Sequence, residues 1–398
     1  MIAVLSLLAM SPPVQVATYE GVPWVEIGVR LRTEPDPRTM HGLGAVTART
    51  IDAALRASPA CGGVCGAHVD GDGITIRAGA TPDGAEAELS RIFEVMRAAG
   101  TEGSVEREVR SAAAAIEALR SDDRRLVYYA LMQVLYAGHP AQSSPLGDVV
   151  GVSRVTADDV AAFVRRNLVG ARVSIRMAGA LDDAAEAWGP ELEAGAAVTS
   201  TVAAPKSVER VRVVVVDKPD RDRVQVAIGW PVDDKDGAAL EVARLAWGGT
   251  VDSPLARLAQ ERDATAVAQL VRRRGATAAI VELTGSEAET PQLLDAVLAA
   301  RRTVKQRGLG DDALQRGRTA FEVRRALAAR DAAAWVHKGP TTPADTPDTR
   351  REKRGVRALV RGEGLVAVVL ASATPELLAR LAALPQVDEV AVFAYDHL

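Results

Sequence analysis

The chain has 398 residues, of which 48% are hydrophobic and 25% charged, with a formal net charge of −4. This length fits two domains of about 200 residues each, and the apolar fraction is enough for ordinary soluble cores. The near-neutral charge excludes the basic surplus that is typical of a nucleic-acid-binding protein.

Residues 1–17 have two interpretations. Residues 2–10 are apolar and residues 14–17 resemble a small-residue cleavage site, which together indicate an export signal and a periplasmic protein. A typical signal has a Lys or Arg before the apolar run, and this chain has none there. A first β-strand in a cytoplasmic protein is therefore the alternative. Elsewhere no segment has the roughly 18 consecutive apolar residues of a membrane-spanning helix, so no integral membrane segment is expected.

The first half of the chain, residues 1–194, mixes strand and helix patterns. Residues 22–31 alternate like a strand, and residues 43–56 have the apolar spacing of a helix. The remaining elements expected here are strands at 64–69 and 73–78, helices at 85–99 and 105–120, and a closing strand at 172–177. Strands mixed with helices in this way predict an α+β domain.

Residues 195–208 are rich in small residues and indicate a linker to a second domain at 209–398. Its expected elements are strands at 211–216 and 225–230, a helix at 238–246, strands at 266–271 and 278–283, helices at 291–307 and 311–329, and a strand at 365–370. The repeated order predicts two homologous α+β domains, each a mostly antiparallel sheet with helices packed on one face. The Pro-rich, basic stretch 338–354 is expected to be a solvated loop, with a basic interaction site as the alternative.

Several short motifs occur in a characteristic order. In the first half they are His139-Pro140, Pro145-Leu146-Gly147, the capped helix start Thr156 to Phe163, and a strand that closes at Gly179; in the second half they are Trp247-Gly248-Gly249, Ser253 and Leu255. Thr156 is a good N-cap, and the Asp residues in the first turn suit the positive helix end. Over nearly the whole length, this order resembles the pitrilysin/insulinase-type zinc peptidases, the inverzincins.

Active members of that family carry H-x-x-E-H on the first long helix, where two His bind zinc and the Glu is the general base. In this chain the resemblance places the His positions on Ala45 and Arg49 and the Glu on Ala48. A further Glu ligand on a later helix falls on Ala114 or Ala115. No H-x-x-E-H or H-E-x-x-H occurs in the sequence. The resemblance therefore predicts a degenerate site with no catalytic residue, no metal and no cofactor.

Other groups give weaker signals. His41 and His68, with Asp70 and Asp72 nearby, are the members of a conceivable rearranged metal site, although a surface His and a polar turn explain them as well. The family's substrate-contacting Arg and Tyr fall on Pro254 and near Val267, and Arg257 is a possible substitute for the Arg. His68 and Arg257 are thus the candidate substrate-binding residues.

The two cysteines, Cys61 and Cys65, are explained either by a disulfide or by two small buried residues beside a Gly-Gly turn. Two thiols are too few for a usual four-ligand zinc site.

The resemblance implies a catalytically inactive subunit that pairs with an H-x-x-E-H-bearing paralogue, or with itself, to close a peptide-processing chamber. Extended peptides are expected to bind along a sheet edge by β-augmentation. Two alternatives remain. One is a purely structural or assembly subunit of a larger complex, like the peptidase-derived core subunits of respiratory complexes. The other is an active zinc metalloendopeptidase with an atypical metal site.

Overall fold

The computed structural model describes residues 9–19, 22–58, 64–119, 121–198, 209–219, 221, 223–273, 275–338, 346–362 and 364–395. The chain forms two compact units. Unit 1 comprises residues 1–117, 143–201 and 327–341, and unit 2 comprises residues 118–142, 202–326 and 342–398. Each unit thus takes segments from both predicted domains, and the predicted sequential boundary at 195–208 remains a prediction.

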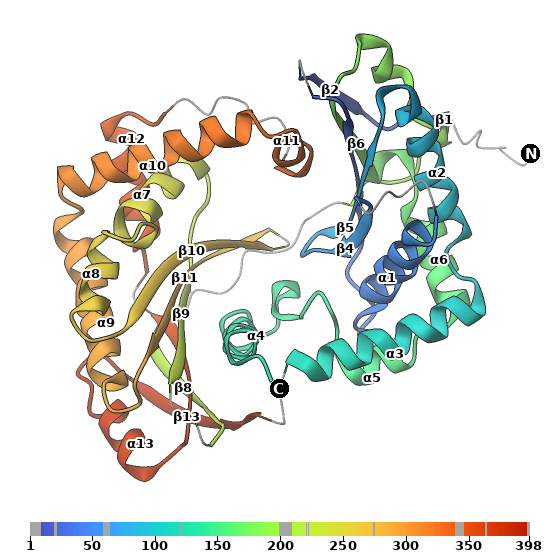
Figure 1. The fold of residues 1–398 in the computed structure, drawn as a ribbon. Coiled ribbons are helices and arrows are strands. Elements are labelled where there is room, and N and C mark those ends of the chain that lie inside the picture. Colours follow the sequence, from blue (N-terminus) through green and yellow to red (C-terminus); the bar gives the residue numbers. More distant parts are fainter. Residues whose placement is uncertain are drawn as a thin grey trace, which may run out of the picture. The chain divides into compact units, whose positions relative to one another are not determined.

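Unit 1 is built on a five-stranded mixed sheet with the strand order β2-β6-β3-β5-β4 (Figure 1). Its strands are β2 (Val14–Thr18), β3 (Val25–Arg32), β4 (Gly66–Val69), β5 (Gly73–Ala80) and β6 (Val173–Gly179). β2 runs parallel to β6, and the other neighbours are antiparallel. A separate short pair joins β1 (Ala9–Met10) to β7 (Leu192–Glu193). β1 and all of β2 except Thr18 thus fall inside the ambiguous segment 1–17, of which residues 1–8 lie outside the described residues.

Alternation along the central strand β3 decides which face of the sheet becomes the main core. Val25, Ile27, Val29 and Leu31 are fully buried on one face, because successive side chains in a strand point to opposite sides. Helices from several parts of the chain cover this face: α1 (Leu43–Arg56), α2 (Ala85–Ala98), α3 (Glu102–Leu119) and α6 (Ala157–Asn167). The expected Thr156 cap is present, since its hydroxyl accepts from the Asp159 N–H while Asp159 accepts from the Thr156 N–H.

The opposite face of the same sheet receives the short helix α11 (Ala332–Lys338). Val336 of α11 packs directly over Gly28 of β3, so closely that a Cβ at Gly28 would clash with the Val336 side chain. Ala178 and Ala332 complete a small apolar cluster there. The other short segments described in unit 1 are η2 (Pro82–Gly84), α5 (Val149–Ser153), η4 (Gly170–Arg172) and η5 (Asp183–Ala187), whereas η3 (Pro140–Gln142) belongs to unit 2.

Unit 2 contains a six-stranded mixed sheet with the order β10-β11-β9-β12-β8-β13. Its strands are β8 (Val211–Asp217), β9 (Val224–Pro231), β10 (Thr265–Arg273), β11 (Ala276–Gly285), β12 (Leu365–Ala371) and β13 (Glu389–Ala394). Strands β8-β12-β9-β11-β10 repeat the unit 1 order and directions, with β13 added in parallel outside β8. Common ancestry of the two halves remains a prediction.

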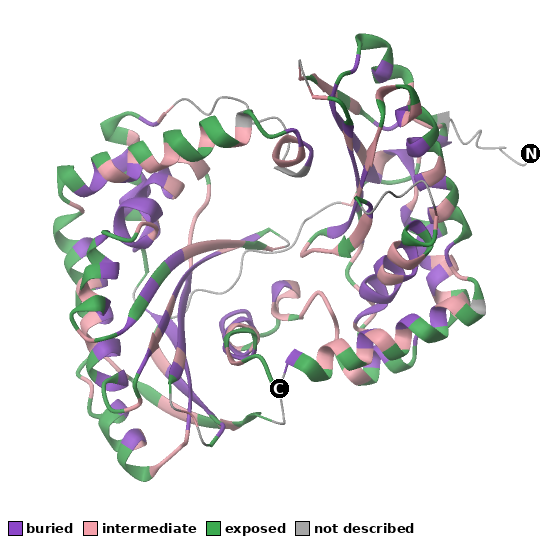
Figure 2. Ribbon diagram, in the orientation of Figure 1, coloured by how far each residue is buried: buried purple, intermediate pink, exposed green. Residues whose placement is uncertain are grey.

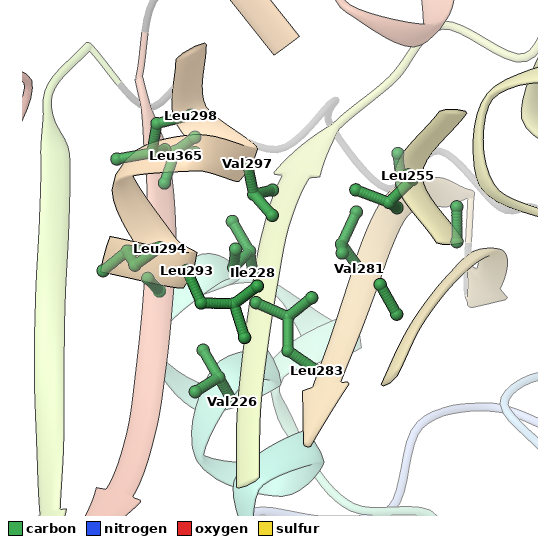
Figure 3. Close-up of a cluster of buried hydrophobic side chains, with 14 of the residues drawn as sticks. Val226, Ile228, Leu255, Val281, Leu283, Leu293, Leu294, Val297, Leu298 and Leu365 are labelled. Carbon is green, nitrogen blue, oxygen red and sulfur yellow. The ribbon is translucent and has the colours of Figure 1, made fainter. Parts of the chain in front are cut away.

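Both faces of the unit 2 sheet are buried, which explains why β12 is apolar along its whole length. On one face lie α7 (Gly237–Gly248), α8 (Pro254–Gln260), α9 (Thr290–Arg307), α10 (Asp311–Ala329), α12 (Thr349–Leu359) and α13 (Pro375–Ala382). Figure 3 shows part of this core, where Leu293, Leu294 and Val297 of α9 meet Val226 and Ile228 of β9.

The other face of that sheet is covered by α4 (Asp123–Leu135), which comes from the first half of the sequence. Leu131 of α4 lies over Gly229 of β9, where a Cβ would be 2.9 Å from Leu131 Cδ2. The α+β class with two mixed sheets is confirmed, whereas the prediction of helices on one face only missed α4 and α11. Figure 2 shows the resulting pattern, with buried strands and helices exposed along their outer sides.

Residues 349–354, expected to lie in a loop, instead belong to α12. The helix is held by its buried side: Glu352, Gly355, Val356 and Leu359 are all buried. In the described part of the chain, no helix combines the length and the apolar character needed to cross a bilayer.

Candidate functional site

The predicted zinc-ligand positions lie on α1, against α3. Ala45 and Ala48 are almost completely buried, with 1% and 2% of their surface exposed. Arg49 is half-buried, and its Nη1 donates a hydrogen bond of 2.9 Å to the Ser111 hydroxyl on α3. The two methyl side chains offer no donor atom, and the third position holds a fixed cation that is bonded to the neighbouring helix.

The turn before α1 brings Gly42 against Leu146 and Gly147, which are distant in the sequence. Gly42 has φ of +107°, and a Cβ there would be 2.8 Å from the Leu146 carbonyl oxygen. The carboxylate of Asp36 accepts from the N–H groups of Gly42 and Gly44, at 2.8 and 3.1 Å. Asp36 therefore caps a helix start that has no side-chain cap of its own. The turn before α1 is thus held by backbone contacts and by the Asp36 carboxylate.

On α3, the residue that faces Arg49 is Ser111, four positions before the predicted Ala115. Ala115 is half-buried. Glu108 lies one turn before Ser111, is 8% exposed, and pairs with Arg107 at 3.0 Å. Ser111 and Glu108 were not singled out from the sequence. The one available signal was their spacing on the same helix, in steps of three or four residues from the predicted position, which places them on the same side of α3. That Ala45, Arg49 and Ala115 are former ligand positions remains a prediction.

The structure does not bring the scattered histidines into one site. His41 lies 3.3 Å from the carboxylate of Asp148, while His68 is exposed on β4. Partial desolvation of the ring by its neighbours, and then the charge of Arg77, lower the pKa of His68. Within the ranges that the structure describes, no three His, Cys, Asp or Glu side chains are grouped so that they could hold a metal ion.

The other candidate substrate residue, Arg257, is exposed on α8 of unit 2. Its neighbours in the family pattern are placed as follows: Pro254 is the first residue of α8, and Val267 is 51% exposed on β10. A substrate role for His68 or Arg257 therefore remains a prediction.

Strands β2 and β4 are the two edges of the unit 1 sheet, and β4 is the edge that lies beside α1. The Ala67 N–H on this edge is already bonded to Asp52 of α1, at 2.8 Å. Asp52 also accepts from Arg56, at 2.9 Å. A side chain thus satisfies one of the edge donors, which is a common way of protecting an edge strand from pairing.

Cys65 precedes β4 and is buried and disulfide-bonded. For Cys65, the disulfide interpretation is therefore the correct one. The only other cysteine in the sequence, Cys61, lies outside the described residues.

In sequence, no protein-family model and no curated protein matches this chain. Solved structures do match over nearly the full length. An M16 peptidase inactive domain from Pseudomonas fluorescens has a TM-score of 0.78 at 15% identity, over 92% of this chain and 98% of that one. A protease from Helicobacter pylori has a TM-score of 0.76 at 14% identity, over 92% and 99%. A chain of complex III2 from Candida albicans has a TM-score of 0.70 at 13% identity, over 94% and 97%. At these identities, the likeness establishes the fold.

Proposed function

Starting from the M16, pitrilysin-like fold of this chain, we propose that it is a catalytically inactive subunit that pairs with a zinc-bearing sibling to close a peptide-processing chamber. The observation that carries this proposal is the α1–α3 contact, in which Arg49 is bonded to Ser111 beside two buried alanines. The fold is complete, and the groups that would bind zinc and move protons have been replaced.

The chemistry of these replacements argues against zinc at this position. Zinc in proteins is held by Cys, His, Asp or Glu, and Ala45 and Ala48 provide none of these groups. A guanidinium does not lose its proton in proteins, so Arg49 would repel a divalent cation at close range. The likeness to a domain described as inactive supports the same proposal.

A purely structural subunit is the second candidate, and the hydrogen bond from Ala67 to Asp52 favours it. A peptide that adds a strand to β4 would have to displace this 2.8 Å bond. The likeness to a chain of complex III2 also supports a role in an assembly. As a structural subunit, the chain would contact a partner protein and would not bind peptide.

Reconstitution with a sibling tests the main proposal. The chain is purified alone and together with an H-x-x-E-H-bearing paralogue from the same genome, and zinc content and cleavage of an unstructured peptide are measured. We expect cleavage and zinc only in the mixture, and loss of both when the sibling's first motif His is changed to Ala. Stoichiometric zinc and cleavage by this chain alone would establish an atypical metal site and refute the proposal.

A single substitution distinguishes the two proposed functions, a peptide-contacting chamber subunit and a purely structural subunit. Asp52→Leu removes the acceptor that caps the Ala67 N–H but nearly keeps the size of the side chain. If peptide pairs with β4 in the complex, freeing this edge should lower the KM for peptide. An unchanged KM, with an intact complex by size-exclusion chromatography, would favour the structural subunit.

A further inference from the structure

An arginine cluster lies on the α11-side face of the unit 1 sheet, away from the degenerate zinc site. In the strand register, Gly28 of β3 is directly opposite Arg77 of β5 and Arg176 of β6. Arg30, two residues along β3, is on the same face because side chains alternate. Three guanidinium groups from three adjacent strands therefore surround one glycine.

These side chains line a narrow recess. Arg30, Arg77 and Arg176 form its walls with Ser174, Thr75 and Val336, over the backbone of Gly28 and Val29. The recess has a volume of about 10 Å³, which admits one oxygen-sized atom. Gly28 keeps it open, because any side chain there would collide with Val336.

The three arginines are partnered to different degrees. Arg30 reaches Asp70 and Asp72 at 3.3 and 3.4 Å. Arg176 donates to Gln15 at 3.1 Å and to the Val336 carbonyl at 3.5 Å, both neutral acceptors. Burial, and then the charges of Arg30 and Arg32, lower the pKa of Arg176. No carboxylate bonded to Arg176 neutralises its charge in the described part of the chain.

Arg77 is the least satisfied of the three. Its Nε is buried without a hydrogen-bond partner, as is the Nε of Arg30. The carboxylate of Glu26 is on this face too: it interacts electrostatically with Arg77, and its Oε1 accepts from the Trp24 indole at 3.1 Å. The ring of His68 is on this face too, opposite Thr75, and adds no negative charge. A buried Nε–H without an acceptor is unfavourable, so an acceptor from outside the chain would stabilise the half-buried side chain of Arg77.

We propose that this recess binds one carboxylate oxygen of an acidic side chain from an extended peptide, with Arg77 as the main donor. Planar guanidinium groups match carboxylates in geometry and charge, and such charge-assisted bonds are stronger than neutral ones. The recess takes one oxyanion oxygen, and the experiment below distinguishes a peptide carboxylate from phosphate as its source. The peptide as the source rests on the proposed function, which thereby gains a substrate class: peptides with acidic residues.

The test uses the full chain without a sibling, so it is independent of the reconstitution experiment. Two fluorescent peptides that differ only by a central Glu or Gln are titrated with the protein, and binding is followed by anisotropy. We expect the Glu peptide to bind about 10-fold more tightly. Arg77→Gln should abolish the difference, and Arg77→Lys should keep part of it. The control Arg97→Gln removes the same charge from an exposed position on α2 and should change nothing.

Inorganic phosphate distinguishes the sources of the oxyanion. Displacement of the Glu peptide by phosphate, dependent on Arg77, agrees with the proposal, whereas binding of phosphate without any binding of the Glu peptide overturns it. Equal affinity of the two peptides, no binding of either, or equal weakening by Arg97→Gln also overturns it. Thermal melting checks the variants: Arg77→Gln should melt no lower than the wild type, because it removes an unsatisfied buried group.

Discussion

The hydrogen bond between Arg49 and Ser111 links α1 and α3, the two helices on which the zinc-ligand positions are predicted. We expect Arg49→Ala and Ser111→Ala each to destabilise the fold by about 1 kcal/mol, because a half-buried charged hydrogen bond is lost. The double variant should cost less than the sum, since both changes remove the same bond. Urea unfolding of the four proteins measures the coupling. Additive costs would mean that the bond does not form in solution.

His68 gives a pH dependence whose sign follows from its environment. Burial, and then Arg77, lower the pKa of His68 below 6.5, against the opposing effects of Asp70 and Asp52. Below that pH the unfolded chain takes up a proton that the folded chain resists, so stability falls as the pH decreases from about 6.5. His68→Gln should lose less stability than the wild type between neutral and mildly acidic pH. Titration of the His68 ring by NMR at or above its usual pKa would contradict this.

At the scale of elements, a glycine in the central strand of each sheet receives a helix from the other half of the sequence. Gly28 is covered by Val336 of α11, and Gly229 by Leu131 of α4. We expect Gly28→Ala to cost about 1–3 kcal/mol through overpacking. Val336→Ala should restore part of this loss in the double variant, because it removes the methyl groups that clash. Chemical denaturation measures both, and a double variant no more stable than Gly28→Ala would show that the helix is not seated on the glycine.

The same elements show how far the sequence predicts the fold. The helices predicted at 43–56 and 311–329 coincide with α1 and α10, because their apolar spacing is local information. The loop prediction for 349–354 was wrong. The many charged residues of α12 favoured a loop prediction, but one side of the helix is buried, and there Glu352 is paired with Arg318 at 2.6 Å. A buried ion pair across 34 residues cannot be recognised from one segment alone.

The candidate site shows the same division. Ala45, Ala48 and Arg49 could be singled out from a linear pattern, whereas the partner of Arg49 could not. Which residue of α3 faces α1 depends on how the two helices are rotated, and tertiary packing decides that. The arginine cluster was missed for a similar reason, since Arg30, Arg77 and Arg176 are brought together by strand register. The three arginines are far apart along the chain, so nothing in the sequence indicates that they form a cluster.

At the scale of the whole molecule, each compact unit needs a segment that is distant in sequence. α4 precedes the linker but buries Leu126, Leu131 and Leu135 in unit 2, and α11 follows it but packs in unit 1. Fully burying one such leucine contributes about 1.5–3 kcal/mol. We therefore predict that fragments 1–201 and 202–398 are each soluble only poorly when expressed alone, and bind the dye ANS. Co-expressed, they should purify together and melt cooperatively.

Two substitutions in α4 test whether this helix is the reason why the two fragments need each other. Leu131 is fully buried, whereas Gln133 is exposed on the same helix. In the 1–201 fragment, Leu131→Asp should abolish co-purification with 202–398, because a carboxylate cannot be buried against Gly229 and its apolar neighbours without a partner. Gln133→Asp, which introduces the same charge, should leave it unchanged. If both fragments are soluble, monomeric and cooperatively folded alone, the sequential division at 195–208 describes the folding units better than the exchange of α4 and α11 does.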